Sequence, residues 1–332
     1  MKRGRVEVVA FESDVLRGNA AGDPHVRRVP IYLPPSYDTA PTKRFPVVHV
    51  LTGFTGRGRM LLNDNPWSPS LDDRMDALIA AGSPELILVM PDCFTRFGGS
   101  QYVDSTATGR YETHLVKELV PWVDAHYRTL AAREHRGIAG KSSGGFGAMR
   151  LGMLHADVFG AIACHSGDML FEYCYAVDFP KACSVLQAAG GVRRFLEAFE
   201  AKPQKPKDDF LALNILAMAA CYSPEPKAEM GVDLPFDLGT GLPRPAVFER
   251  WLAVDPLRLL PARAEALRSL RLLYIDCGTK DEFHLHHGAR AFTAELKKLG
   301  IDHRYEEFDD GHMNVPYRYD VSLPALARAL ST

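Results

Sequence analysis

The stretch RGIAGKSSGGFG, residues 136 to 147, decides the fold. Its first apolar residues indicate the end of a buried strand, and the following FGAMRLGML has the apolar spacing of a helix packed on a sheet. Between them GKSSG matches the Gly-x-Ser-x-Gly pattern of a nucleophile elbow. Side chains at Gly140 or Gly144 would clash with the crossing strand and helix. The stretch therefore predicts strand, sharp turn and helix, with Ser142 held out at the helix N-terminus.

The composition is typical of a globular protein and gives no indication of a highly charged partner. Of 332 residues, 46% are hydrophobic and 24% charged, enough to bury a large core. The net charge is -2 with no block of Lys or Arg, which gives no indication of a nucleic-acid or membrane partner. The apolar run near the N-terminus is broken by Glu7 and ends at Glu12, too short for a signal-peptide core. We therefore expect a cytoplasmic protein.

Cysteine usage points the same way, since no CxxC pair is present and several cysteines sit in apolar runs. We expect buried free thiols rather than disulfides or a zinc site. The six are Cys93, Cys164, Cys174, Cys183, Cys221 and Cys277.

Apolar patterns on both sides of the elbow alternate between strand and helix. This alternation predicts an α/β fold, with a mostly parallel central sheet covered by helices on both faces. Pro121 is expected to kink its helix. The strands are expected at 6–11, 25–33, 45–51, 86–90, 159–164, 271–276 and 303–308, and the helices at 71–81, 111–127, 287–299 and 321–330.

The alternation breaks down over residues 168–254, where helical patterns are separated by proline-rich stretches. We expect one domain over 1–332, with 168–254 as an inserted, mainly helical cap. The run DFLALNILAMAACY is apolar nearly all round but well short of the ~20 residues that span a bilayer. It is either a buried cap helix or a contact in a homo-oligomer.

Two loops near the C-terminus supply partners for Ser142. DCGTKDEF follows one predicted strand and DDGH follows the next. A serine hydroxyl needs an imidazole to take its proton, and the imidazole needs a carboxylate to fix its tautomer. We predict His312 as the base and Asp281 as the acid. Asp276 and Glu282 compete for the acid role, but the first lies inside the strand and the second one step further along the loop.

A glycine-bearing loop, TGFTG at 52–56, follows the strand that ends at Leu51. Its backbone N–H groups would face a substrate oxygen, or the loop is an ordinary turn.

Together these segments resemble the putative esterase family of α/β hydrolases, which includes S-formylglutathione hydrolases, enterochelin and feruloyl esterases, and mycolyltransferases. The resemblance covers about residues 25–168 and 255–332, through LTGFTG, IAGKSSGGFGAMRLG, HSGD, DCGTKDEF and EEFDDGHMN. It implies an α/β-hydrolase fold and a serine carboxylic-ester hydrolase that needs no cofactor or metal. Ser142, Asp281 and His312 would form the triad, with the N–H groups of Ser143 and Phe54 as the oxyanion hole.

The chain departs from the family pattern at three places. Thr52 replaces a frequent histidine, so the oxyanion donor is Phe54 or Thr55; Lys141 and Ser143 replace the usual His and Met of the elbow. The oxyanion loop also lacks the cysteine of S-formylglutathione hydrolases, which argues against a glutathione thioesterase. An acyltransferase on the same fold is the remaining alternative.

Two other functional classes compete with a serine esterase. The histidines at 284, 286 and 287, beside acidic residues, would suit a metal-dependent hydrolase, although the cluster sits where the triad loop enters its helix. A binding protein without catalysis is the second rival, and the intact triad argues against it. For an esterase we expect a small-molecule ester partner of short-to-medium acyl or aryl type, contacted by Trp67, Met169 and Phe171 beside Phe54.

Overall fold

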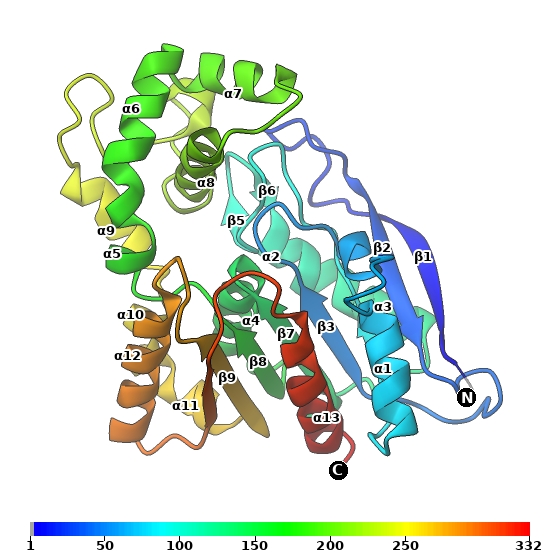
Figure 1. The fold of residues 1–332 in the computed structure, drawn as a ribbon. Coiled ribbons are helices and arrows are strands. Elements are labelled where there is room, and N and C mark those ends of the chain that lie inside the picture. The colour runs from blue at the N-terminus through cyan, green and yellow to red at the C-terminus, as the bar shows by residue number, and fades with distance from the viewer. Residues whose placement is uncertain (1–2) are drawn as a thin grey trace.

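A central sheet of eight strands organises residues 3–332, which the computed structural model describes (Figure 1). The spatial order is β1-β2-β4-β3-β7-β8-β9-β10. The strands are β1 (Arg5–Glu12), β2 (Val26–Leu33), β3 (Val47–Leu51), β4 (Ile87–Val89), β7 (Arg136–Lys141), β8 (Ala161–His165), β9 (Leu272–Gly278) and β10 (Arg304–Phe308), and β5 (Asp104–Ser105) pairs with β6 (Gly109–Arg110) in a separate ribbon.

Only the first part of the sheet is antiparallel. Strand β1 pairs antiparallel with β2, and β2 with β4, whereas all pairs from β4 to β10 are parallel. The carboxyl ends of β3, β7, β8, β9 and β10 therefore meet at one edge, where open α/β sheets bind ligands. This confirms the predicted α/β-hydrolase architecture.

Helices cover both faces of the sheet because successive strand residues point to opposite sides. In β3, Val48 and Val50 pack on one face with α1 (Leu71–Ala80) and α13 (Tyr319–Leu330), while Val47 and Leu51 pack on the other. That second face carries α3 (Val120–His126), α4 (Ser143–Leu154) and α12 (Leu285–Lys298). In Figure 1, α1 and α13 lie side by side in front of the strands.

The predicted helix over 111–127 is broken into three pieces. It runs as α2 (Tyr111–Thr113), a π-helical turn over His114–Leu119, and α3, which begins at Val120 with Pro121 in its first turn. Proline has no N–H to donate to the preceding turn. The wider turn before Pro121 takes up this break, which sequence inspection expected as a simple kink.

Between β8 and β9 the chain forms a helical layer above the carboxyl edge, seen at the upper left of Figure 1. Helix α8, which is apolar nearly all round, buries most of its residues from Ala212 to Tyr222 within this one chain. Of the described residues, no helix is both long and apolar enough to cross a membrane. The layer comprises α5 (Phe171–Cys174), α6 (Phe179–Ala189), α7 (Val192–Ala201), α8 (Lys207–Tyr222) and α9 (Pro245–Leu252), and α10 (Pro256–Leu259) and α11 (Ala264–Arg268) lead back to β9.

All six cysteines are buried and unpaired, as the sequence predicts. Three lie in the helical layer and three in the sheet and its loops. Burial raises the pKa of each thiol, which disfavours the reactive thiolate form.

Candidate active site

The elbow has the strained geometry that its glycines predict. Ser142 lies between β7 and α4 with φ 59° and ψ -126°, a backbone conformation that side-chain-bearing residues rarely adopt. A Cβ on Gly140 would lie 2.3 Å from the carbonyl oxygen of Gly144, and one on Gly144 would lie 2.3 Å from that of Leu51. Only glycine allows strand and helix to approach so closely. Ser142 is thereby held at the carboxyl edge of the sheet.

Asp281 and His312 meet although 31 residues separate them. Oδ2 of Asp281 lies 2.7 Å from Nδ1 of His312, and both side chains are buried. Burial opposes ionisation of Asp281, but the hydrogen bond and charge of His312 hold the pKa of the carboxyl below its usual range. Oδ1 accepts hydrogen bonds from the N–H groups of Phe283 and Leu285. The carboxylate is therefore ionised and fixed against the imidazole.

Nε2 of His312 is left for the serine. No hydrogen bond joins it to Oγ of Ser142 in this structure, but both residues line one cavity. Catalytic hydrogen bonds are often long in the unliganded state and tighten with substrate. The structure thus brings Asp281 into contact with His312 at the cavity that Ser142 also lines.

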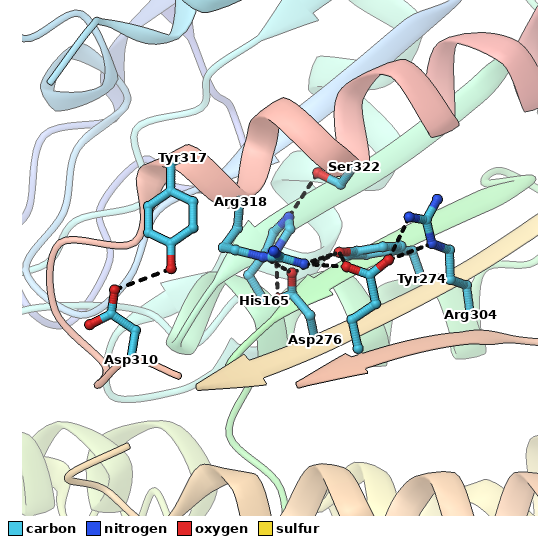
Figure 2. A network of polar contacts seen from close by, with 9 residues as sticks. His165, Tyr274, Asp276, Arg304, Asp310, Tyr317, Arg318 and Ser322 are labelled. Atoms are coloured by element: carbon cyan, nitrogen blue, oxygen red, sulfur yellow. Dashed lines mark hydrogen bonds and ion pairs between the residues drawn. The ribbon is translucent and has the colours of Figure 1, made fainter. Parts of the chain in front are cut away.

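The two competing carboxylates have other partners. Asp276 in β9 is fully buried and accepts hydrogen bonds from His165, Tyr274 and Arg318, as Figure 2 shows. Glu282 instead accepts the backbone N–H of His312 at 2.6 Å. Neither carboxylate contacts the His312 imidazole.

Ser322 continues the Asp276 network, because its Oγ lies 2.9 Å from Nε2 of His165 (Figure 2). Ser322, His165 and Asp276 thus form a second hydrogen-bonded set of a serine, a histidine and an aspartate. All three are fully buried, and none lines the cavity at Ser142. This set of side chains joins β8, β9 and α13 and has no access to a substrate.

The hydrogen bonds of the 52–56 loop distinguish the two candidate oxyanion donors, Phe54 and Thr55. The N–H of Thr55 donates to the carbonyl oxygen of Gly98 at 2.7 Å, so it is not available. The N–H of Phe54 has no acceptor within residues 3–332, and the same holds for that of Ser143 at the first turn of α4. These two N–H groups are free to stabilise an oxyanion beside Ser142.

A cavity of about 330 Å³ opens over Ser142, between the sheet edge and the helical layer. Its walls are mainly apolar. In the layer they include Leu211 and Phe210, whose ring meets that of Phe54 edge to face. The other lining residues are Gly53, Thr55, Lys141, Ser143, Asp168, Cys174, Tyr175, Asp178, Lys207, Asn214, Phe283, Leu285, His312 and Met313.

Three residues predicted to contact substrate do not line this cavity. The Trp67 side chain is 92% exposed and does not line this cavity. Met169 and Phe171 are buried in the core instead: the backbone of Met169 abuts Gly288, and the Phe171 ring stacks on Tyr222. Their position just after HSGD suggested that they lie near the site. Between HSGD and Phe171, however, the backbone of Leu170 is left-handed, with φ 59°.

Two residues at the site were not predicted: Tyr102 lies in the long loop over 94–109, and Asp168 ends the HSGD segment, which was used only for the family resemblance. The Tyr102 hydroxyl donates to the carbonyl oxygen of Thr52 at 2.6 Å and so supports the oxyanion loop. Asp168 is a buried carboxylate on the cavity wall whose Oδ2 accepts from Tyr175 at 2.7 Å and from Gln101 and Ser143 at 3.3 Å. Burial raises the pKa of Asp168. The length of the loop over 94–109 was the sequence feature that could have pointed to Tyr102.

The histidines near α12 do not assemble into a ligand set. The rings of His286 and His287 lie 4.1 Å apart between centroids, and His287 packs on Tyr173. Within residues 3–332, no group of three His, Cys, Asp or Glu side chains is arranged to hold a metal ion.

Comparison with known proteins agrees with this geometry. Esterase Rv1288 of Mycobacterium tuberculosis is 38% identical over 90 residues, 27% of this chain and 20% of that protein. The chain thus spans about a fifth of the length of this curated relative.

Two solved structures share the whole fold. A ferulic acid esterase superposes with a TM-score of 0.65 and 22% identity, covering 99% of this chain and 100% of the other. The fluorophosphonate-binding serine hydrolase FphF of Staphylococcus aureus gives 0.61 and 14%, covering 99% of each chain. At these identities the likeness concerns the fold. The model of the family described as putative esterase matches residues 24–328, nearly the whole chain, and the protein therefore belongs to that family.

Proposed function

We propose that the protein is a serine carboxylic-ester hydrolase that works through an acyl-enzyme. The observation that carries this proposal is the 2.7 Å contact between Asp281 and His312, facing the same cavity as the strained Ser142. A carboxylate held against an imidazole is what a weak hydroxyl nucleophile needs. Membership of the putative esterase family supports it.

Each group has one role in the proposed reaction. Oγ of Ser142 attacks the ester carbonyl while Nε2 of His312 takes the hydroxyl proton. The N–H groups of Ser143 and Phe54 stabilise the oxyanion, and His312 then protonates the leaving alcohol. Water, activated by the same imidazole, hydrolyses the acyl-enzyme. Asp281 stays ionised and stabilises the imidazolium.

The substrate class follows from the cavity. Its volume of about 330 Å³ is near the lower end of ligand pockets, roughly 300 to 1,000 Å³. The wall contains Phe54, Phe210 and Leu211, which suit an apolar or aromatic group. We therefore propose short-to-medium acyl esters or aryl esters as substrates, taken from a cytoplasmic pool.

A fluorophosphonate probe and an ester panel test the proposal together. The probe should label the wild type at Ser142 and leave Ser142→Ala unlabelled. Rates on 4-nitrophenyl acetate, butyrate, octanoate and palmitate, and on methyl ferulate, should fall sharply for the longest chain. Failure to label Ser142 together with no hydrolysis of any ester would refute the proposed function.

A further inference from the structure

Asp168 is a buried carboxyl group in the active-site cavity that the proposed reaction does not use. It lies just after β8, is 6% exposed and lines the cavity over Ser142. Its Oδ2 accepts three hydrogen bonds, from the Tyr175 hydroxyl at 2.7 Å and from Gln101 and Ser143 at 3.3 Å. None of these donors is charged, so the protein satisfies one oxygen of this carboxyl with neutral groups alone.

The other oxygen, Oδ1 of Asp168, is left for a ligand. It makes no hydrogen bond with any of residues 3–332. It is nevertheless not sealed inside the protein, unlike the two ring nitrogens of His49, which are fully enclosed and lack partners. The hollow that Asp168 lines is the one that Ser142 and His312 also line. We therefore place Oδ1 at the cavity of the nucleophile.

A polar network holds the Asp168 carboxyl in position. The Gln101 amide that donates to it also donates to the Tyr222 hydroxyl at 3.1 Å. The network joins the loop over 94–109, the first turn of α4, the end of α5 and the end of α8. Gln101 itself has φ 47°, which is costly for a residue with a side chain. A carboxyl group fixed from four segments of the chain is preorganised for a ligand.

A hydroxyl group suits Oδ1 better than a cation does. Asp168 already lies in the field of Lys141 and His312, and the lysines and aspartates that line the cavity, Lys141, Lys207, Asp168 and Asp178, balance in charge. Burial raises the pKa of Asp168 and so disfavours its charged form. A hydroxyl serves both forms, because it donates to a carboxylate and accepts from a carboxylic acid.

The position of Asp168 assigns this hydroxyl to the acyl portion of the ester. The leaving alcohol takes its proton from Nε2 of His312, so the alcohol portion lies on the side of His312. Asp168 instead contacts Ser143, whose N–H is a proposed donor to the carbonyl oxygen. Only atoms close to the carbonyl reach a carboxyl group that contacts this residue. The hydroxyl is therefore on the second or third carbon of the acyl chain.

We propose that Oδ1 of Asp168 binds a hydroxyl group on the acyl portion of the substrate, so that the preferred esters are those of 2- or 3-hydroxy acids. This inference rests on the proposed function and names its substrate class. Without a substrate, water can take the place of the hydroxyl. An acyl group with a methyl at that place would displace the water and leave Oδ1 unpaired, which is costly in a buried site.

Matched methyl esters test the inference. Methyl 3-hydroxybutyrate and methyl 3-methylbutyrate differ by a hydroxyl in place of a methyl group, as do methyl lactate and methyl 2-methylpropionate. Wild-type enzyme is assayed on all four, with both enantiomers of each hydroxy ester, and each rate is divided by that of alkaline hydrolysis. We expect kcat/KM to favour the hydroxy ester in at least one pair by about 10- to 100-fold, as for a hydrogen bond to an ionisable group.

Variants assign the preference to Asp168. Asp168→Leu, similar in size but without a polar side-chain atom, should lower the ratio of the two rates about tenfold or more. Asp178→Asn changes another carboxyl group that lines the cavity and is the matched control; it should keep the wild-type ratio. If Asp168→Leu does not fold, Tyr175→Phe replaces it. This variant removes the shortest hydrogen bond to Oδ2, so the ratio should again fall.

The outcomes separate this inference from the function beneath it. Hydrolysis in both pairs with ratios near one overturns the inference, since water would then serve Oδ1 as well as a hydroxyl does, and leaves the esterase proposal standing. An equal loss on both members of a pair in Asp168→Leu also overturns it, because the carboxyl would then act on Ser143. A ratio that falls only in Asp178→Asn overturns it as well. No hydrolysis of any ester and no labelling at Ser142 would instead refute the esterase proposal itself.

Discussion

The amide of Thr55 donates to the carbonyl of Gly98 at 2.7 Å, and this hydrogen bond, with that from the Tyr102 hydroxyl to the Thr52 carbonyl, joins the oxyanion loop to the loop over residues 94–109. The first of these bonds occupies the Thr55 N–H and leaves that of Phe54 without an acceptor among residues 3–332. Gly98 itself has φ +100°, and a Cβ there would lie 2.7 Å from the Phe54 ring. The position of the proposed oxyanion donor therefore depends on a glycine that touches no substrate.

Gly98→Ala should displace Phe54 and lower kcat by about 10- to 100-fold, somewhat less than complete loss of an oxyanion donor. Gly82→Ala is the matched control, since Gly82 also has a positive φ, +96°, but open space around it. Steady-state kinetics on 4-nitrophenyl acetate measures both variants. A similar loss in the two would show that backbone strain, and not the contact with Phe54, causes the effect.

Substitution in the triad should abolish catalysis without unfolding the protein. Ser142→Ala and His312→Ala should each lower kcat by roughly 10⁴-fold or more, because the triad acts as a unit. Asp281→Asn should cost about 10³- to 10⁴-fold, since an amide favours the wrong tautomer of His312. Glu282→Gln, which affects only the backbone bond to His312, is the control and should cost far less. The acid assignment fails if these last two results are reversed.

Arg318→Met should affect stability more than chemistry. It leaves the fully buried Asp276 with one charged partner fewer, and breaking a buried ion pair typically costs about 3 to 5 kcal/mol. Urea denaturation should show this loss in the free energy of unfolding. Activity per folded molecule should fall less than tenfold; a loss as large as that of Asp281→Asn would place the Asp276 network in catalysis.

Phe171→Ala should destabilise the protein without changing its selectivity. The ring is fully buried between Phe146, Tyr175 and Tyr222, and removal of such a ring costs about 3 to 5 kcal/mol. Leu211→Ala is the opposite case, because Leu211 lines the cavity and is only partly buried. It should shift the preference among acyl chain lengths with little loss of stability. Relative kcat/KM values and denaturation curves distinguish the two.

Acid should weaken the attachment of α2 to α4. Burial opposes ionisation of Glu112, but hydrogen bonds and charge from His155 and Arg150 lower its pKa to about 2. A carboxyl whose folded pKa lies below its unfolded value stabilises the fold above the unfolded pKa, and this stability is lost as pH falls through the folded one. The free energy of unfolding should therefore fall between about pH 4.5 and 2. In Glu112→Gln this part of the decrease should be smaller.

The local sequence was enough to predict a residue's role wherever that role depends on its immediate neighbours. Gly140, Ser142 and Gly144 lie within five residues, and their steric requirements could be worked out before the fold was known. Asp281 could be preferred over Asp276 because the strand pattern places the latter in β9. Chain order, strand ends and triad chemistry thus agree at this edge of the sheet.

The substrate contacts could not be predicted in this way. Whether Phe171 lines the cavity or the core depends on Phe146 and Tyr222, which come from separate helices. The exposure of Trp67 could not be predicted for a similar reason, since no sequence pattern near it shows that its ring points to solvent. Long-range packing decides exposure, and the helical layer has no repeating pattern from which such packing follows.

The six buried thiols give the protein a built-in set of reporters. Cys174, Cys183 and Cys221 lie in the helical layer, whereas Cys93, Cys164 and Cys277 lie in or beside the sheet. An alkylating reagent reaches each only when its surroundings open. If the layer detaches from the sheet before the sheet unfolds, brief alkylation followed by mass analysis would mark the first three ahead of the others. Opening of the layer could then be timed without engineering new cysteines into the protein.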